Sequence, residues 1–320
     1  TLKNNKEIAL EAVKEKVDSF FFLSEELKND KNIVMEAVKQ NGGSLKYASL
    51  ALQNDKEVVL AAIENKNYAI EFASEELRND KEFILPNILK NNIQLKYLSD
   101  NLKDDEDIVK LSVIVSGHML EYASPRLQNN KEIAMTAVQN VGVALEYVSP
   151  ELQNDRELVL IATHDNGYAF GFASEELKND KNLVLKICHN SGNALKYVSE
   201  ELRNDPEIVK EAIKQNGKSI EYASSRLQND KDIIEECIKH YGTDIFKYTN
   251  DDIRNNRDIM FRAVQVTGFN INYASEELRN DENLMRVALK TCSWAYQFAG
   301  PELKEKYPTV EKFIEAAKEK

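Results

Sequence analysis

Apolar residues along the chain follow the spacing of helices, and the same pattern returns many times. After Asp30, the residues Ile33, Val34, Ala37 and Val38 lie three and four positions apart, which is the spacing of one helix face. A shorter segment with apolar residues follows, and the pattern then starts again. The pattern therefore predicts a longer and a shorter helix in every unit.

An Asn-Asp step, or a close variant of it, marks the start of each unit. The interval between steps is 25 residues, except for one interval of 26 between Asn229 and Asn255. The steps begin at Asn4, Asn29, Asn54, Asn79, Asp104, Asn129, Asn154, Asn179, Asn204, Asn229, Asn255 and Asn280. The second residue of the step can accept hydrogen bonds from the free N–H groups of a first helical turn. We therefore predict an all-α solenoid of about twelve 25-residue two-helix repeats, with the first complete unit from Asn4.

Other positions repeat with a restricted choice of residues. A serine caps one more turn before the next step, as in the stretch from Ser74 to Leu77. A glycine, or Asn67 and Asn92 in its place, follows the long helix, where we expect a left-handed residue that ends the helix. The recurring Asn is expected to bond the backbone of the neighbouring unit. The glycines are Gly42, Gly117, Gly142, Gly167, Gly192, Gly217, Gly242 and Gly268.

One position is aromatic in every unit. Its residues are Phe22, Tyr47, Phe72, Tyr97, Tyr122, Tyr147, Phe172, Tyr197, Tyr222, Tyr248, Tyr273 and Phe298. Because Phe and Tyr replace one another freely, the ring matters and the hydroxyl does not. We therefore expect these rings to pack in the core between stacked units.

The 25-residue period stops after Leu303. Residues 305–320 carry Val310, Phe313, Ile314 and Ala317 on one helical face, with charged residues opposite. We expect residues 1–304 to form the solenoid and residues 305–320 to form a C-terminal capping helix.

Charge and composition argue against several kinds of site. The net charge of −12 offers no basic stripe for a nucleic-acid backbone, and no apolar run approaches the roughly 18 residues of a membrane helix. His164 and His189 share a column in adjacent units, but a bridging metal would need closer imidazoles and further ligands. We expect no catalytic residue, no cofactor, no metal, no nucleic acid and no membrane insertion.

The segments Asn54–Arg78 and Asn154–Lys178 carry a resemblance to a known family. They read NDKEVVLAAIENKNYAIEFASEELR and NDRELVLIATHDNGYAFGFASEELK. The chain resembles, from Leu2 to about Lys304, a family known as domain of unknown function 4116. The resemblance implies a module without assigned activity, found in proteins of protists and of bacteria that live inside amoebae, some of them exported into a host. It leaves two locations open for a soluble protein, the cytoplasm and a host cell.

Two neighbouring units depart from the pattern. Pro86 lies inside a long helix, which it should kink or shorten. Leu89, Leu111, Ile114 and Val115 stand where other units carry mostly polar residues. Two interpretations stay open: a locally thicker core, or an exposed apolar patch that binds a partner.

The residue after the helix-ending glycine is the most variable of the repeated positions. Its residues include Tyr68, Ile93, His118, Val143, Tyr168, Asn193, Lys218, Thr243, Phe269 and Trp294. Variation in size and polarity indicates that packing does not dictate this position, so it is either a recognition ridge or an ordinary solvated loop. Ile93 and His118 could extend the apolar patch around Leu89 and Ile114.

The function expected from these features is a non-enzymatic repeat scaffold for protein–protein interaction. From the family resemblance, it would be part of an exported, host-directed protein, a secreted effector. The alternative is a structural spacer or a regulatory arm of a larger enzyme. The partner would be a protein of unknown identity, and self-association is a further alternative.

Overall fold

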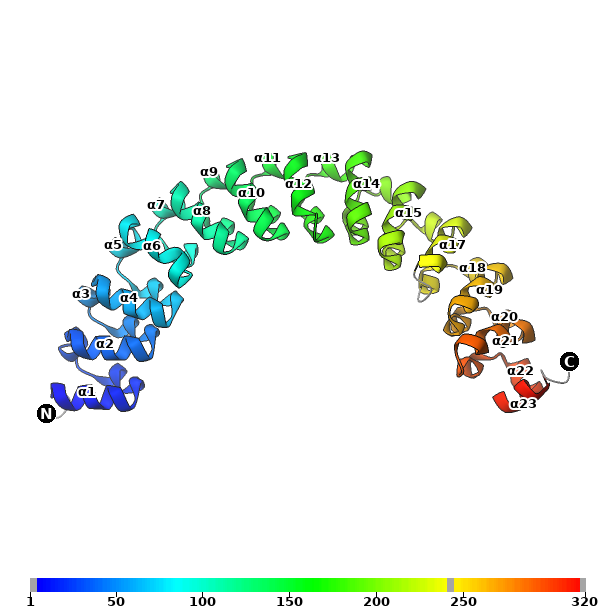
Figure 1. The fold of residues 1–320 in the computed structure, drawn as a ribbon, viewed down its shortest axis with the longest axis horizontal. Coiled ribbons are helices and arrows are strands. Elements are labelled where there is room, and N and C mark those ends of the chain that lie inside the picture. Colours follow the sequence, from blue (N-terminus) through cyan, green and yellow to red (C-terminus); the bar gives the residue numbers. More distant parts are fainter. Residues whose placement is uncertain (1–4, 241–244, 317–320) are drawn as a thin grey trace. The chain divides into compact units, whose positions relative to one another are not determined.

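The computed structural model describes residues 5–240 and 245–316, and over these residues it contains helices and no strand (Figure 1). The chain divides into two compact units, Thr1–Ala162 and Thr163–Lys320. Within each unit every repeat packs on the next, which confirms the predicted all-α solenoid of 25-residue repeats. The predictions for Asn4, Gly242, Thr243 and residues 317–320 lie outside the described residues.

Each repeat holds three helical segments, a long α-helix, a 3-10 helix and a short turn. The long helices of the first unit are α1 (Lys6–Glu15), α2 (Lys31–Gln40), α4 (Lys56–Asn65), α6 (Lys81–Asn91), α8 (Glu106–Val115), α10 (Lys131–Asn140) and α12 (Arg156–Ala162). Its 3-10 helices are η2 (Val17–Phe22), η4 (Gly42–Tyr47), η5 (Asn67–Phe72), η6 (Leu95–Tyr97), η7 (Gly117–Tyr122) and η8 (Gly142–Tyr147). Its short turns are η3 (Leu27–Asn29), α3 (Leu50–Gln53), α5 (Glu75–Arg78), α7 (Asp100–Lys103), α9 (Pro125–Gln128) and α11 (Pro150–Gln153).

The second unit repeats this order. Its long helices are α14 (Lys181–Asn190), α15 (Pro206–Gln215), α17 (Lys231–His240), α19 (Arg257–Val266) and α21 (Glu282–Thr291). Its 3-10 helices are η9 (Gly167–Phe172), η10 (Gly192–Tyr197), η12 (Gly217–Tyr222), η13 (Ile245–Tyr248), η14 (Gly268–Tyr273) and η15 (Ala295–Phe298). Its short segments are α13 (Glu175–Lys178), η11 (Leu202–Asn204), α16 (Ser225–Gln228), α18 (Asp251–Arg254), α20 (Glu276–Arg279), α22 (Pro301–Lys306) and α23 (Val310–Ala316).

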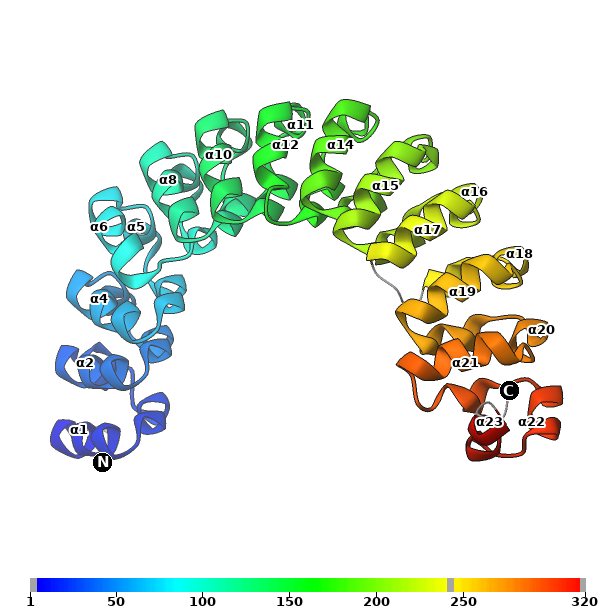
Figure 2. The ribbon, with the colours of Figure 1, turned by 45° about the vertical axis from the view of Figure 1, so that its right-hand side comes forward.

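The long helices begin at the predicted caps and form the core. The Asp30 side chain accepts hydrogen bonds from the N–H groups of Asn32 and Ile33 at the start of α2. The apolar face predicted for this helix, from Ile33 to Val38, is completely buried. Each long helix lies beside the next one in its unit, as α2 lies beside α4 and α14 beside α15 (Figures 1 and 2).

The recurring glycine is required by close packing and not by a left-handed backbone. The extended residue Asn41 ends α2, and Gly42 begins η4 without entering the left-handed region. A Cβ on Gly42 would overlap the carbonyl oxygen of Ala62 in the next long helix. Gly117, Gly142, Gly192 and Gly268 meet the carbonyl oxygens of Ala137, Ala162, Ala212 and Ala288 in the same way. The left-handed prediction is therefore wrong for these glycines and for Asn67, and it holds at Asn92, where φ is 52°.

The recurring Asn bonds mainly to a side chain of the next repeat. Ser49 Oγ donates to Asn29 Oδ1 over 2.6 Å, while the Ser49 hydroxyl also accepts from the Leu52 N–H as a cap. The same bond joins Ser99 to Asn79, Ser149 to Asn129, Ser199 to Asn179 and Ser224 to Asn204. The expected bond to backbone occurs at Asn229 and Asn280, which accept from Asn250 N–H and Leu303 N–H. In the five serine pairs named above, the cap serine stands between the Asn and the backbone.

In seven places a cation of one repeat pairs with the capping aspartate of the next. Lys56 Nζ lies 2.6 Å from Asp80 Oδ2, and Lys181 Nζ lies 2.7 Å from Asp205 Oδ2. Equivalent pairs are Lys6–Asp30, Lys31–Asp55, Lys81–Asp105, Lys131–Asp155 and Arg257–Asp281. The Lys56 ammonium, and then the Phe83 N–H, hold the pKa of Asp80 below its ordinary value. At the other six aspartates partial burial by itself would raise the carboxyl pKa. The hydrogen bonds and the paired cation lower it by more, so the pKa of these aspartates is also below its ordinary value.

We expect the protein to lose stability in acid because of these pairs. A carboxylate whose pKa is lower in the folded state stabilises the fold fully above its unfolded pKa, about 3.9 for Asp, and ceases to do so as pH falls through the folded value. The urea midpoint should stay level from neutral pH to about pH 5 and fall below about pH 4. The variant Lys31→Gln/Lys56→Gln should show a smaller fall, because Asp55 and Asp80 then titrate nearer their unfolded pKa. An identical fall in parent and variant would assign the acid sensitivity to other groups.

Pro86 does not shorten its helix. Helix α6 has 11 residues, one more than α4, and the Asn87 side-chain amide donates to the Phe83 carbonyl over 2.7 Å. The longer helix is followed by the left-handed Asn92 and by η6, which has three residues where η5 has six. The extra helical residue is therefore accommodated in the 3-10 segment, and the prediction of a shortened helix is wrong.

The last helical segment covers the end of the second unit. Phe313 of α23 is 1% exposed, and its ring lies 5.2 Å from the ring of Tyr296 and 5.4 Å from that of Tyr307. The Tyr296 hydroxyl donates to the Tyr307 carbonyl over 2.6 Å. The Arg286 guanidinium lies 5.8 Å from the centre of the Phe313 ring.

Candidate functional site

The recurring aromatic ring stands at the last residue of each 3-10 helix and is partly exposed. The buried residues Gly42 and Leu45 of η4 and Ala48, which follows its last residue, lie three apart, which places them in one row along a 3-10 helix. Tyr47 falls outside this row, so its outer part meets solvent. The prediction that the rings lie in the core is therefore wrong for every described ring of the column.

We call these rings the aromatic stripe. In the first unit it consists of Phe22, Tyr47, Phe72, Tyr97, Tyr122 and Tyr147, and in the second of Phe172, Tyr197, Tyr222, Tyr248, Tyr273 and Phe298. Successive 3-10 helices contact one another within each unit, as η7 contacts η8. The rings of one unit thus follow one another across neighbouring repeats.

The variable residues lie against the aromatic stripe. Tyr68, Tyr168 and Trp294 are exposed, as is His118, and Phe269 is half-buried. Each of these rings packs edge-on or tilted against a ring of the stripe. The distances between ring centroids are 6.3 Å for Tyr68–Phe72, 6.1 Å for His118–Tyr147, 6.2 Å for Tyr168–Tyr197, 6.2 Å for Phe269–Tyr273 and 5.9 Å for Trp294–Phe298. The two columns therefore form one surface, which the sequence did not indicate.

Ile93 is the exception among the candidate residues. It is 2% exposed and so is unavailable to a partner. The extra residue of α6 and the left-handed Asn92 displace the chain at this point, so that Ile93 turns into the core next to the buried Leu95. The prediction of an exposed position is wrong here.

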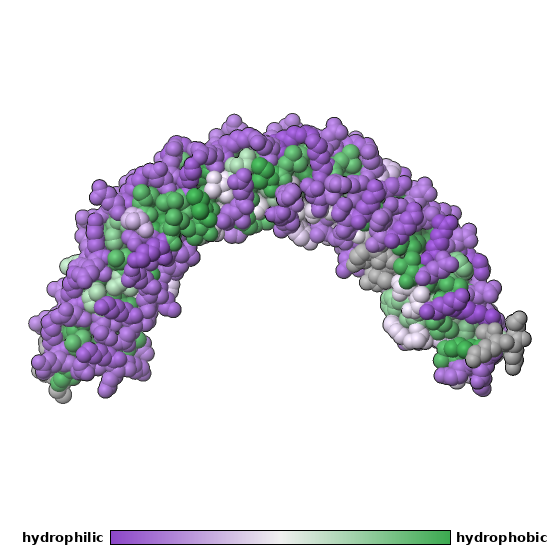
Figure 3. Space-filling model, viewed as in Figure 1, coloured by the Kyte–Doolittle hydropathy of each residue, from purple (hydrophilic) through white to green (hydrophobic). Residues whose placement is uncertain are grey.

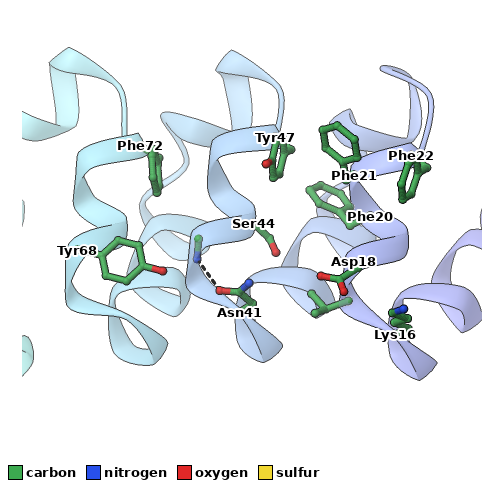
Figure 4. Close-up of a pocket in the computed structure, with 12 residues that line it drawn as sticks. Lys16, Asp18, Phe20, Phe21, Phe22, Asn41, Ser44, Tyr47, Tyr68 and Phe72 are labelled. Atoms are coloured by element: carbon green, nitrogen blue, oxygen red, sulfur yellow. Dashed lines mark hydrogen bonds between the residues drawn. The ribbon is translucent and has the colours of Figure 1, made fainter.

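A pocket of about 600 Å³ opens on the stripe side of the first three repeats (Figure 4). It is lined by Lys16, Val17, Asp18, Phe20, Phe21, Phe22, Asn41, Gly43, Ser44, Tyr47, Tyr68 and Phe72. Gly43 stands at the same variable position of its repeat as Tyr68 in the next repeat. Because Gly43 has no side chain, the space that a side chain would fill there is open and forms part of the pocket. Figure 4 shows Tyr68 on one side, Asp18 on the other, and Asn41 and Ser44 between them. Rings and a few polar groups suit one bulky side chain of a ligand.

The apolar patch lies on the long helices and not on the stripe. Leu89 of α6 is 57% exposed and Ile114 of α8 is 48% exposed, while Leu111 and Val115 are half-buried. Figure 3 shows apolar surface gathered over α6 and α8. Leu89 and Ile114 therefore do not thicken the core, and the patch is a second candidate contact surface.

The two histidines of the shared column have separate neighbours. His189 Nδ1 lies 2.6 Å from Glu211 Oε1, and His164 Nε2 lies 3.9 Å from Asp165 Oδ1. In residues 5–240 and 245–316, no three His, Cys, Asp or Glu side chains are grouped so that they could hold a metal ion. None of the helices in these ranges combines the length and the apolar composition of a membrane span.

Comparison with known families gives a match along most of the chain. The family described as "Domain of unknown function (DUF4116)" matches residues 5–53, 55–103, 80–128, 105–153, 130–178, 155–203, 180–228, 205–254, 230–279 and 256–304. Each match covers two consecutive repeats, so the family pattern describes a repeat pair. No curated protein and no solved structure matches the chain.

Proposed function

Because the chain belongs to the family of the domain of unknown function (DUF4116), we propose its function from its surface: a non-enzymatic repeat scaffold that binds a protein partner along the aromatic stripe. The observation that carries the proposal is the partial exposure of one ring in every described repeat, with variable side chains packed against it. Tyrosine and tryptophan are the residues that anchor protein interfaces, since they bury a large area with few rotatable bonds.

Partial burial makes these rings effective contact residues. The inner part of each ring is held by the 3-10 helix and by neighbouring rings, as Phe269 is held by Phe298 at 5.7 Å and by Tyr273. A side chain that is already ordered loses little conformational entropy when a partner covers it. A structural spacer would need no such rings, and a solvated charged surface would serve it better.

The test is capture of a partner by the full chain and by two surface variants. The host-directed role implied by the family resemblance suggests an amoebal lysate as the source. We expect Tyr122→Ala/Tyr147→Ala to recover the partner at least tenfold less, because a truncated anchor ring costs about 1–2 kcal/mol. The matched variant Leu89→Glu/Ile114→Glu should recover it as the parent does.

Circular dichroism of both variants should equal that of the parent, since all four residues are partly exposed. If only the Leu89→Glu/Ile114→Glu variant loses the partner, the binding surface is the apolar patch on α6 and α8. If neither variant loses it, the stripe of the first unit does not bind the partner.

A further inference from the structure

We infer that the aromatic stripe at Tyr122 and Tyr147 takes a basic, extended segment of a protein partner, with one Lys or Arg side chain over each of these two rings. The inference rests on the proposed function and adds the chemical class of the partner. Three observations carry it: the lysines that lie over stripe rings of this chain, the glutamates that precede two rings without such a lysine, and the spacing of the repeats.

The chain already uses stripe rings to bind cations. Lys96 Nζ lies 4.6 Å from the centre of the Tyr97 ring, and in the second unit Lys247 Nζ lies 4.7 Å from that of Tyr248. In both cases the lysine immediately precedes the aromatic residue. A ring face at this distance attracts an ammonium group through its quadrupole. The outer side of the stripe is thus accessible to cations in a favourable geometry.

At Tyr122 and Tyr147 the preceding residue is a glutamate, and both glutamates are exposed. The Glu121 carboxylate raises the pKa of Tyr122, first through a hydrogen bond and, after burial, through its charge. Burial and then the charges of Glu146 and Glu121 raise the pKa of Tyr147. The Glu121 charge therefore acts on both rings, and Lys96 offsets part of it at Tyr122. Because η7 and η8 contact one another, the two glutamates and the two rings belong to neighbouring repeats of one surface.

A cation from outside would supply here what Lys96 supplies at Tyr97. Charge complementarity favours a basic partner in steering and in specificity, and the net charge of −12 adds to the attraction. Arginine suits the site best, because its planar guanidinium stacks on rings and bonds carboxylates in the same contact.

The repeat spacing indicates the register of the partner. Packed helices lie about 8–10 Å apart, and a polyproline II segment advances about 9.3 Å in each turn of three residues. Every third side chain of such a segment would therefore meet the next ring. The partner segment should carry Lys or Arg at every third position.

The test uses synthetic peptides and the full chain. A fluorescein-labelled peptide with the sequence Arg-Pro-Pro repeated four times is titrated at low salt and followed by fluorescence anisotropy. We expect it to bind at least tenfold tighter than the Gln-Pro-Pro peptide of equal length, and tighter than an isomer with its four arginines adjacent. Raising the salt concentration should weaken binding, because exposed charges are screened.

Protein variants separate charge from structure. Glu121→Gln/Glu146→Gln should reduce affinity for the Arg-Pro-Pro peptide about tenfold. Glu57→Gln/Glu64→Gln removes the same charge from exposed positions of α4 and should leave affinity unchanged. Equal affinity for the arginine and glutamine peptides, or equal loss in the two variants, would overturn the inference. If the arginine peptide fails while Tyr122→Ala/Tyr147→Ala still loses the captured partner, the scaffold function stands and the basic register is wrong.

Discussion

Gly42→Ala should lower the free energy of unfolding of the first repeats by about 3 kcal/mol or more, whereas Gly43→Ala should change it by about 1 kcal/mol or less. The two glycines are adjacent, and neither lies in the left-handed region. A Cβ on Gly42 would overlap the Ala62 carbonyl oxygen, which belongs to backbone and cannot turn away. A Cβ on Gly43 meets the Tyr68 hydroxyl at 3.2 Å and Asn41 Oδ1 at 3.3 Å, and both are ends of side chains.

Amide hydrogen exchange in α1, α2 and α4 would measure this difference locally, and urea unfolding by circular dichroism would measure it globally. Accelerated exchange should be confined to the Gly42→Ala variant. Similar exchange in the two variants would mean that the repeats separate at little cost, and the account of the recurring glycine would be wrong.

Phe313→Ala should cost the second unit about 3–5 kcal/mol of stability. The ring is 1% exposed and fills the space between Tyr296, Tyr307 and Arg286. Ile314→Ala is the matched control, because Ile314 belongs to the same helix but is 43% exposed, so its loss should cost about 1 kcal/mol or less.

Trp294 is the one tryptophan of the chain, so its fluorescence reports on the repeats next to α23. Urea unfolding followed at this residue should shift strongly in Phe313→Ala and little in Ile314→Ala. Deletion of Tyr307–Lys320 should shift it at least as far as Phe313→Ala. An unchanged midpoint in the deletion would show that the segment is a linker rather than a cap.

The long helices could be predicted from the sequence because their signals are local. The capping residue Asp30 and the apolar face after it act within one helix, and the 25-residue period requires neighbouring units to stack. The role of Gly42 could not be predicted, because the atom that excludes a side chain there, the Ala62 oxygen, lies in the next repeat. A left-handed helix end and a close contact with the next repeat would both require glycine at this position. The sequence alone therefore does not distinguish the two causes.

The proposed binding surface was only partly predictable, for a related reason. Exposed Tyr68 and Trp294 were found from their variability, but the rings beside them were assigned to the core because the column is always aromatic. A 3-10 helix turns every three residues, and this geometry places Tyr47 outside the buried row of Leu45. Two signals point to the exposure: a charged residue often precedes the ring, and the ring is more often Tyr than Phe, which suits a hydroxyl in water.

Hydroxyl-radical footprinting of the full chain, alone and with its captured protein partner, would show directly which surface the partner covers. The measurement compares oxidation at the stripe tyrosines with oxidation at Leu89 and Ile114 on the long helices. We predict that the partner protects Tyr122 and Tyr147, while Leu89 and Ile114 react as in the free chain. If the stripe tyrosines react as in the free chain and protection falls on the long helices or the short turns, the partner does not bind along the aromatic stripe.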